Sequence, residues 1–172
     1  RLIGGLFDIK FQRPRPLVER ALRIEVPERA TADGEILTDV AEYDYAILAE
    51  RLKRDNVETV AVCFINAYAN PANEAAARMR LAELLDDMAV CHSVAVVREK
   101  GEFERFSTCV LNAYLTPVIG AYLDTLTDEL EGQGLSAPVS IMGSNGGVMT
   151  LAAAANFAAG TFLSGPVGGV GG

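Results

Sequence analysis

Two glycine-rich loops near the carboxyl end of the chain carry residue types suited to binding an anion. They span residues 141–147 and 163–172, and each follows a short apolar run that fits a strand. Glycine lets backbone N–H groups approach a ligand closely and adopt positive φ. Pro166 suits the first position of a helix, and a helix start with free N–H groups attracts phosphate or carboxylate. The loops therefore predict part of an anion site, with Ser164 or Gly165 as the helix cap.

The same two loops admit a second interpretation. Small residues let a helix cross tightly against another element, and that packing needs no ligand. Neither loop matches the phosphate-binding patterns G-x-x-x-x-G-K-[ST] or G-x-G-x-x-G. Spacing alone therefore favours packing and leaves the anion site as the alternative.

Cysteine and histidine are the other residue types that could do chemistry. The three cysteines, Cys63, Cys91 and Cys109, are widely spaced, odd in number and set in apolar runs. This pattern is typical of reduced, buried thiols in a cytosolic protein. A catalytic Cys–His pair with His92, the one histidine, is the alternative, because a nucleophilic cysteine needs a base. The spacing supports no metal site, and a structural hydrogen bond is the expected role of His92.

Composition bounds the class of partner. The chain has 172 residues, half of them apolar, with a net charge of −8 and a pI near 4.7. A nucleic-acid binder should present a basic face, so nucleic acid is not an expected partner. No apolar run is long enough to span a membrane, and no signal peptide is recognisable, so a cytoplasmic protein is expected. The absent initiator Met and the Gly171-Gly172 end predict a piece of a longer chain.

Residues 1–40 predict an antiparallel ribbon. Residues 17–26 alternate apolar and charged side chains, as in a half-buried strand. Asp33-Gly34 is a hairpin turn signal, and residues 35–38 fit the return strand.

A helix and a strand are predicted next. Asp39 or Asp44 caps a helix that runs to about Asp55, with Asn56 as a left-handed stop. Residues 59–65 are apolar on both faces, as expected for a central strand covered on two sides.

The pattern then repeats as helix and strand. Asn70-Pro71 begins a second helix, in which Glu74 precedes Arg78 by four residues. Residues 90–97 form another strand. The order strand, helix, strand predicts a βαβ unit with a right-handed crossover.

A long amphipathic helix dominates the second half. Residues 98–108 are charged and predict a loop that leads into a helix, and apolar residues then recur at steps of three and four from 111 to 130. Pro117 is expected to kink or split this helix. The remaining predicted elements are a strand over residues 138–142 and a short helix over residues 152–155.

Five stretches of the chain carry recognisable motifs. The most specific reads FERFSTCVLNAYLTPV over residues 103–118, and the others are residues 8–18, 32–37, 60–71, and 144–147 with 163–166. Taken in their order along the chain, these five stretches resemble the hydantoinase A / 5-oxoprolinase / acetone carboxylase β-subunit family. Each motif is weak by itself, whereas five in the family's order are specific.

The resemblance implies a fold and a division of the chain. The fold is α/β: a fragment of an actin-like ATPase (ribonuclease H-like) lobe, with a mixed sheet flanked by helices. Residues 1–40 would be an antiparallel strand ribbon continuing the first lobe, residues 41–160 the α/β body of that lobe, and residues 161–172 the start of the segment that crosses between lobes.

The resemblance also implies a function. Members open or activate small cyclic imides, lactams or related carbonyl compounds by ATP-dependent phosphorylation of an oxygen. An amide oxygen is a poor leaving group, and phosphoryl transfer makes it a good one. The substrate would be a small cyclic amide or carbonyl compound. The partner would be a hydantoinase B-type subunit or a fused domain.

The chain departs from the family by omission. The family's phosphate loops carry an Asp-x-Gly-Gly-Thr pattern that does not occur here. ATP and Mg²⁺ are therefore expected in a full-length parent, with no cofactor tightly bound to this piece, which is expected to be inactive alone. The alternatives are a non-catalytic binding or subunit-interaction module, including the β-subunit role in an ATP-dependent ketone carboxylase, and a small independent hydrolase using Glu102, Glu104 or Cys109.

The resemblance also directs the choice of candidate residues. Catalytic residues are not identifiable, and no metal ligand is expected. Contacts at the cleft between lobes are predicted at Asn145, Gly146, Gly147, Ser164, Gly165 and Gly168. A second set of polar groups is either substrate-side or structural, and it comprises Glu104, Arg105, Ser107 and Asn112.

Overall fold

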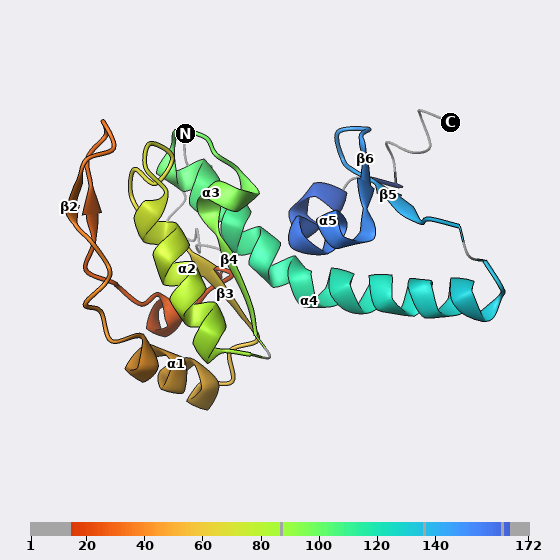
Figure 1. The fold of residues 1–172 in the computed structure, drawn as a ribbon, viewed down its shortest axis with the longest axis horizontal. Helices are drawn as coiled ribbons and strands as arrows, with labels where there is room; N and C mark the ends of the chain where they lie inside the picture. Colours follow the sequence, from red (N-terminus) through yellow and green to blue (C-terminus); the bar gives the residue numbers. More distant parts are fainter. Residues whose placement is uncertain (1–14, 87, 136, 163, 166–172) are drawn as a thin grey trace, which may run out of the picture.

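A computed structural model describes residues 15–86, 88–135, 137–162, 164 and 165 of the chain. These residues form a mixed α/β structure in which one long helix connects two groups of elements (Figure 1). The predictions for residues 1–14, for the helix start at Pro166 and for Gly168 lie outside the described residues.

The centre of the larger group is a parallel strand pair. Strand β3 (Thr59–Val62) pairs in parallel with β4 (Ala89–His92), and helix α2 (Ala72–Leu84) lies between them in the chain. This confirms the predicted β-strand, helix, β-strand unit. Both strands end earlier than predicted. Strand β4 ends at His92 because the short helix α3 (Ser93–Val96) follows it directly.

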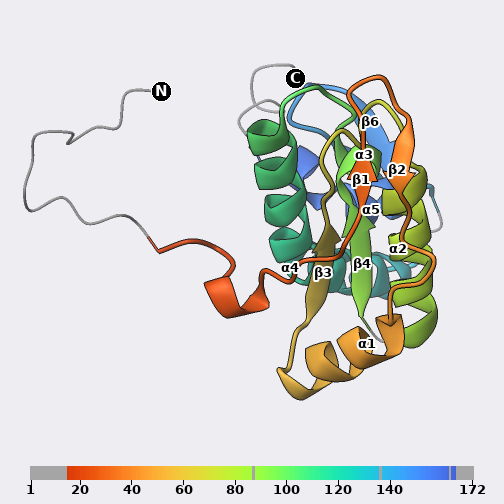
Figure 2. The same ribbon diagram turned by 90° about the vertical axis from the view of Figure 1, so that its left-hand side faces the viewer.

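Helices cover both faces of this strand pair. Helix α2 packs on one face and the first part of α4 (Glu102–Gly132) packs on the other, as Figure 2 shows. Helix α1 (Tyr45–Arg54) packs against α2. The apolar run of β3 is therefore explained, since a strand covered on two sides is apolar on both faces.

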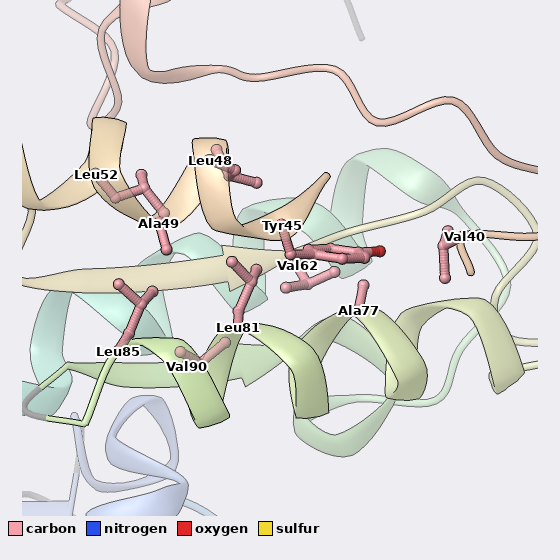
Figure 3. Close-up of a cluster of buried hydrophobic side chains, with 10 residues drawn as sticks. All are labelled: Val40, Tyr45, Leu48, Ala49, Leu52, Val62, Ala77, Leu81, Leu85 and Val90. Carbon is pink, nitrogen blue, oxygen red and sulfur yellow. The ribbon is translucent and has the colours of Figure 1, made fainter. Parts of the chain in front are cut away.

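The hydrophobic core of this group lies between α1, α2 and the strands (Figure 3). Asp44 caps α1, and its Oδ1 accepts hydrogen bonds from the backbone N–H groups of Ala46 and Ile47. Asn56 has a φ of 52° and ends the helix, as predicted. The buried side chains of the core are Val40, Tyr45, Leu48, Ala49, Leu52, Val62, Ala77, Leu81, Leu85 and Val90.

The amino-terminal ribbon is shorter than predicted. The strand predicted over residues 17–26 is wrong: the chain there forms a 3-10 turn, η1 (Arg20–Leu22), and then an extended segment. Ile24 and Val26 pack against the core without a partner strand, which explains the alternating pattern. The ribbon consists of β1 (Arg29–Ala30) and β2 (Ile36–Thr38), paired antiparallel around the predicted turn.

Helix α4 begins earlier than the sequence predicted. Its first residue is Glu102, so the charged stretch predicted as a loop over residues 98–108 is half helical. Pro117 lies inside the helix without splitting it, and the neighbouring Thr116 Oγ1 donates a hydrogen bond to the carbonyl oxygen of Asn112 at 2.8 Å. Figure 1 shows the helix changing direction midway, as a proline kink predicts.

Among the described residues, α4 is also the one helix whose length and apolar composition match a membrane span. Only 22% of its most apolar window is buried, and Tyr114, Val118 and Tyr122 form an exposed stripe at steps of four residues. Length and composition also match a core helix of a water-soluble protein. This feature therefore does not assign the chain to a membrane.

The second group of elements packs on the middle of α4. Strands β5 (Ser140–Met142) and β6 (Val148–Thr150) form an antiparallel hairpin, followed by helix α5 (Leu151–Asn156) and the 3-10 helix η2 (Ala158–Thr161). The sequence predicted β5 and α5 but missed β6. The apolar run before Ser164 is helical at η2, so its interpretation as a strand is wrong.

Candidate functional site

A buried polar network lies where the two parallel strands end. We call it the strand-end network, and it comprises Glu74 of α2, Ser93 and Val94 of α3, Arg105 of α4 and the backbone of Phe64. Phe64 is the second residue after the carboxyl end of β3, and Ser93 directly follows β4. In open α/β structures, ligand sites occur outside the carboxyl ends of the strands.

Glu74 holds three donors in this network. Its Oε1 accepts hydrogen bonds from the Phe64 backbone N–H at 2.7 Å and from the Ser93 hydroxyl at 2.6 Å. Its Oε2 accepts one from the Val94 backbone N–H at 3.1 Å. The Glu74 side chain is fully buried. Burying a carboxylate is costly unless hydrogen bonds replace its hydration, and these three bonds do so for Glu74.

Arg105 completes the network from the opposite face of the strands. Its Nε donates to Ser93 Oγ at 3.0 Å, and its two terminal nitrogens donate to the carbonyl oxygens of Glu99 and Phe64. The guanidinium also lies 3.6 Å from Glu102 Oε1 and against the Phe106 ring. Arg105 is fully buried, so it belongs to the structural alternative stated for it: it fixes the start of α4 against the strand ends.

Glu102 is the partly exposed carboxylate at the edge of this network. Its Oε1 accepts a hydrogen bond from the Asn66 backbone N–H at 3.3 Å, which lowers the pKa of Glu102 below its ordinary value. Arg105 lowers the same pKa to a smaller extent. The carboxylate therefore stays ionised and ties the turn after β3 to the first turn of α4.

The alternative of a catalytic Cys–His pair is wrong. Cys91 contacts Cys109 of α4 with its sulfur, whereas His92, the next residue of β4, faces Glu74 and Arg78 of α2. Successive side chains of a strand point to opposite faces, so neighbouring positions cannot pair. Burial lowers the pKa of His92, which therefore favours the neutral imidazole.

The predicted anion-binding loop forms the turn of the β5–β6 hairpin. Asn145 Oδ1 accepts a hydrogen bond from the Gly147 backbone N–H at 2.9 Å, and Gly146 adopts a φ of 81°. A side chain is rarely tolerated at that φ, which explains glycine there. The turn is closed by a bond from Gly143 N–H to the Gly147 carbonyl oxygen at 2.7 Å. Asn145 thus shapes the loop from within and leaves its amide group at the exposed surface.

A chain of hydrogen bonds connects α4 to this turn. The buried Asn112 accepts from the Ala159 N–H at 3.0 Å through Oδ1 and donates to the Asn156 carbonyl oxygen at 3.2 Å. One residue beyond Ala159, the Gly160 carbonyl oxygen accepts from the Ser144 N–H at 2.7 Å. Asn112 therefore positions η2, and η2 positions the hairpin turn.

The remaining predicted residues are placed as follows. Glu104 and Ser107 are exposed on α4, Ser164 is half-buried and Gly165 is exposed. The structure therefore joins Asn112 with the turn at Asn145, Gly146 and Gly147, while Arg105 belongs to the strand-end network. The hollow at the far end of α4, lined in part by Thr127, Glu131 and Leu151, contains none of the predicted site residues.

Sequence reasoning missed two members of the strand-end network, Glu74 and Ser93. Glu74 is buried and does not pair with Arg78 four residues later, since Arg78 Nε donates instead to the Val90 carbonyl oxygen at 3.2 Å. The signal was present in the spacing. Glu74 precedes Ala77 by three residues and therefore lies on the buried apolar stripe of the helix.

Two family models match the chain. The model described as Hydantoinase/oxoprolinase N-terminal region matches residues 3–85, and the model described as Hydantoinase/oxoprolinase matches residues 105–172. The two matches together cover most of the chain and leave residues 86–104 between them.

Three curated proteins are similar in sequence. An uncharacterised protein of Methanocaldococcus jannaschii is 36% identical over 164 residues, which are 95% of this chain and 24% of that protein. Caprolactamase subunit alpha of Pseudomonas jessenii is 30% identical over 145 residues, 84% of this chain and 21% of that subunit. Acetophenone carboxylase gamma subunit of Aromatoleum aromaticum is 28% identical over 163 residues, 92% and 22% respectively. The chain thus spans less than a quarter of the length of these relatives.

Two solved structures are similar in fold. The ATP-dependent caprolactamase from Pseudomonas jessenii superposes with a TM-score of 0.79 at 28% identity, over 90% of this chain and 23% of that one. The nucleotide-free structure of acetone carboxylase gives the same TM-score at 25% identity, over 92% and 23%.

Proposed function

The chain belongs to the hydantoinase/oxoprolinase family, and from this premise we propose that it is part of an ATP-dependent enzyme that opens cyclic imides or lactams. The chemistry is phosphoryl activation of a carbonyl oxygen. The observation that carries the proposal is the joint similarity, in sequence and in fold, to an ATP-dependent caprolactamase. A lactam hydrolase of this kind is of the hydantoinase or 5-oxoprolinase type.

The proposed activity follows from the energetics of the amide bond. An amide oxygen leaves poorly, and a phosphorylated oxygen leaves well. Phosphoryl transfer depends mainly on positioning and on neutralising charge. A family member therefore needs rigid loops at a cleft more than it needs a nucleophilic side chain.

We assign this chain a positioning role in that enzyme. The strand-end network fixes the start of α4, and Asn112 fixes the hairpin turn that carries Asn145, Gly146 and Gly147. We propose that this turn, together with Ser164, Gly165 and Gly168, contributes contacts at a cleft between two lobes of an actin-like ATPase. In this proposal residues 41–160 are the body of the first lobe, residues 1–40 continue it, and residues 161–172 begin the crossing segment.

ATP and Mg²⁺ are part of the proposal for the longer protein. The described residues hold no group of histidine, cysteine, aspartate or glutamate that suits a metal ion, so they do not fit a Mg²⁺ site. The 172-residue chain alone is expected to bind neither ligand tightly and to be inactive.

We also propose a partner and a location. Two of the similar proteins are named as subunits, alpha and gamma, and this supports a second subunit or fused domain of the hydantoinase B type. The three cysteines are all free, which supports a cytoplasmic location.

The test is substrate-dependent ATP turnover by the longer protein that we propose contains this chain. We expect ADP release to rise with hydantoins, 5-oxoproline or caprolactam, in step with ring opening, and not with the corresponding ring-opened products. The 172-residue chain measured in parallel should turn over no ATP. Micromolar ATP affinity of that chain would contradict the division of roles proposed here.

A second candidate function is supported by the similarity to two ketone carboxylases. In that case the chain belongs to the β-subunit of an ATP-dependent ketone carboxylase. ATP turnover would then require acetone or acetophenone with bicarbonate and would ignore cyclic amides. A non-catalytic interaction module would show neither dependence.

A further inference from the structure

Three cysteines from separate parts of the sequence meet beside α4. Cys91 lies in β4, Cys63 directly follows β3, and Cys109 lies on α4. The Sγ atoms of Cys91 and Cys109 are 3.7 Å apart, and Cys63 lies near enough to Cys109 to raise the pKa of the Cys109 thiol. Ala61 is the register partner of Cys91, so Cys63, two residues further, faces the same side as Cys91. The proposed function uses none of these thiols.

The three cysteines differ in solvent exposure. Cys109 is completely buried, whereas Cys91 and Cys63 are half-buried. Of the two thiols in contact, Cys91 is therefore more accessible to a small oxidant than Cys109. No group of three metal-ligating side chains among the described residues suits a metal ion, so the cluster is not a metal centre.

We propose that Cys91 and Cys109 form a reversible oxidation site, at which a peroxide converts the two thiols into a disulfide bond between β4 and α4. The sulfurs are already in contact. Bond formation requires them to approach by about 1.7 Å, because a disulfide has an S–S length near 2.05 Å. Cysteine side chains make a movement of that size by rotation about χ1 together with a small shift of the helix.

The reaction proceeds in two balanced steps. The Cys91 thiolate attacks one oxygen of hydrogen peroxide, forms a sulfenic acid and releases hydroxide. The Cys109 sulfur then attacks the Cys91 sulfur, and the sulfenic hydroxyl group leaves as water with the Cys109 proton. The proton lost when Cys91 ionised neutralises the hydroxide, so two thiols are oxidised and one peroxide is reduced to two waters.

The surroundings of the two thiols indicate that Cys91 reacts first with peroxide and that Cys109 then forms the disulfide. A hydrogen bond with Cys109 lowers the pKa of Cys91, although burial and the nearby Glu74 oppose that shift. Hydrogen bonding with Cys63 and Cys91, together with burial, raises the pKa of Cys109. Cys91 is thus both the more exposed and the more easily ionised thiol, as the attacking residue must be.

The Cys91–Cys109 disulfide would link α4 covalently to β4 between the two residues that position this helix. Cys109 lies one helical turn after Arg105 and three residues before Asn112, the two residues that fix α4 to its surroundings. Cys63, near Cys109, supplies a third thiol for exchange and reopening.

The test uses the full 172-residue chain, reduced and then treated with hydrogen peroxide. Free thiols are alkylated under denaturing conditions, and peptides are mapped by mass spectrometry. We expect an intramolecular Cys91–Cys109 cross-link, a mass decrease of two hydrogen atoms, an alkylated Cys63 and full reversal by dithiothreitol. Cross-links between molecules, a bond that always contains Cys63, irreversible sulfinic acid at Cys91, or a Cys91 that stays free would each overturn the proposal.

Two variants sharpen the result. Cys63→Ser should form the same cross-link, whereas Cys109→Ala should stop at a sulfenic acid on Cys91 that dimedone traps. Far-UV circular dichroism checks that each variant is folded. If Cys109→Ala does not fold, the mapping of the wild-type chain and of Cys63→Ser still decides the outcome.

Discussion

Glu74 and Arg105 are joined through a single hydroxyl group. Ser93 Oγ donates to Glu74 Oε1 at 2.6 Å and accepts from Arg105 Nε at 3.0 Å. All three side chains are fully buried, and they come from α2, α3 and α4. The hydroxyl is therefore the one group that satisfies a buried carboxylate and a buried guanidinium at the same time.

Removing that hydroxyl should destabilise the protein. Ser93→Ala leaves the Arg105 Nε–H without a partner and takes one donor from Glu74. An unsatisfied buried polar group costs about 1–3 kcal/mol, and groups that carry charge cost more. We expect urea unfolding to show a loss of about 2 kcal/mol or more. The control Ser107→Ala, at an exposed position of α4, should stay within about 0.5 kcal/mol of wild type. Equal stability of the two variants would show that the bridge has no energetic role.

Glu102 should contribute to stability at neutral pH and lose that contribution in acid. Its pKa is lowered in the folded state by the Asn66 N–H, so the unfolded chain binds the proton more readily. The contribution is present above the unfolded pKa of about 4.3 and disappears as pH falls through the folded pKa. Glu102→Gln should therefore flatten the acid side of the stability curve between about pH 6 and about pH 3.

Glu104→Gln is the matched control for that measurement. It removes a charge from the same first helical turn, so the effect of the helix dipole is shared by both variants. Urea midpoints for the two variants at each pH isolate the bond to Asn66. Identical acid profiles would contradict the assignment.

Substituting Tyr45 should leave the stability of the protein equal or raise it, in contrast to the substitution of Ser93. The Tyr45 hydroxyl group is buried and has no hydrogen-bond partner among the described residues, and burial raises the pKa of Tyr45 to about 12. Tyr45→Phe removes an unsatisfied polar group, so stability should stay equal or rise by up to about 1 kcal/mol. The wild type should also lose stability as pH rises above the ordinary tyrosine pKa of about 10, and the variant should lose less. Tyr43→Phe, at a half-buried position, is the control, and a clear loss in Tyr45→Phe alone would indicate an unseen partner.

Asn112 should hold the second group of elements on α4. Asn112→Ala leaves the Ala159 N–H and the Asn156 carbonyl oxygen without their partners, at a cost of about 1–3 kcal/mol. Hydrogen exchange should accelerate over residues 140–162 much more than over the β3–β4 pair. Asn156→Ala, which removes an exposed amide, serves as the control. Uniform acceleration over the whole chain would mean that Asn112 supports global stability instead.

Asn145 tests the proposed function. In the longer protein, Asn145→Ala should lower ATP turnover about tenfold or more, because small misplacements at a catalytic cleft cost this much. Stability should change by only about 1 kcal/mol, the value of one hydrogen bond. The measurement is kcat alongside the thermal midpoint, with Asn156→Ala as control. An unchanged kcat would remove Asn145 from the site.

Local pattern predicted the scaffold better than the contacts between elements. The β3–α2–β4 unit and the Asp44 cap follow from periodicity and capping chemistry, which short stretches of sequence contain. The alternation of residues 17–26 was misleading, because Ile24 and Val26 bury their side chains without a partner strand. An alternating pattern reports burial of one face, and it does not report hydrogen bonding.

The candidate site was predicted only in part. The glycines of residues 143–147 predicted a loop with positive φ, and Gly146 has a φ of 81° in the hairpin turn. The roles of Arg105 and Glu74 depend on Ser93, which lies on a third element, and no local pattern connects the three. A charged side chain is expected at the solvated surface unless its tertiary partners are known. This explains why the burial of Glu74 was not predicted.

The shared hydroxyl of the strand-end network constrains how this protein can evolve. Replacing Glu74 or Arg105 singly strands the opposite charge in the interior, while replacing both by apolar groups of similar volume removes the need for Ser93. Viable sequences should therefore exchange all three positions as a set, and a homologous alignment in which they drift independently would be incompatible with the bridge.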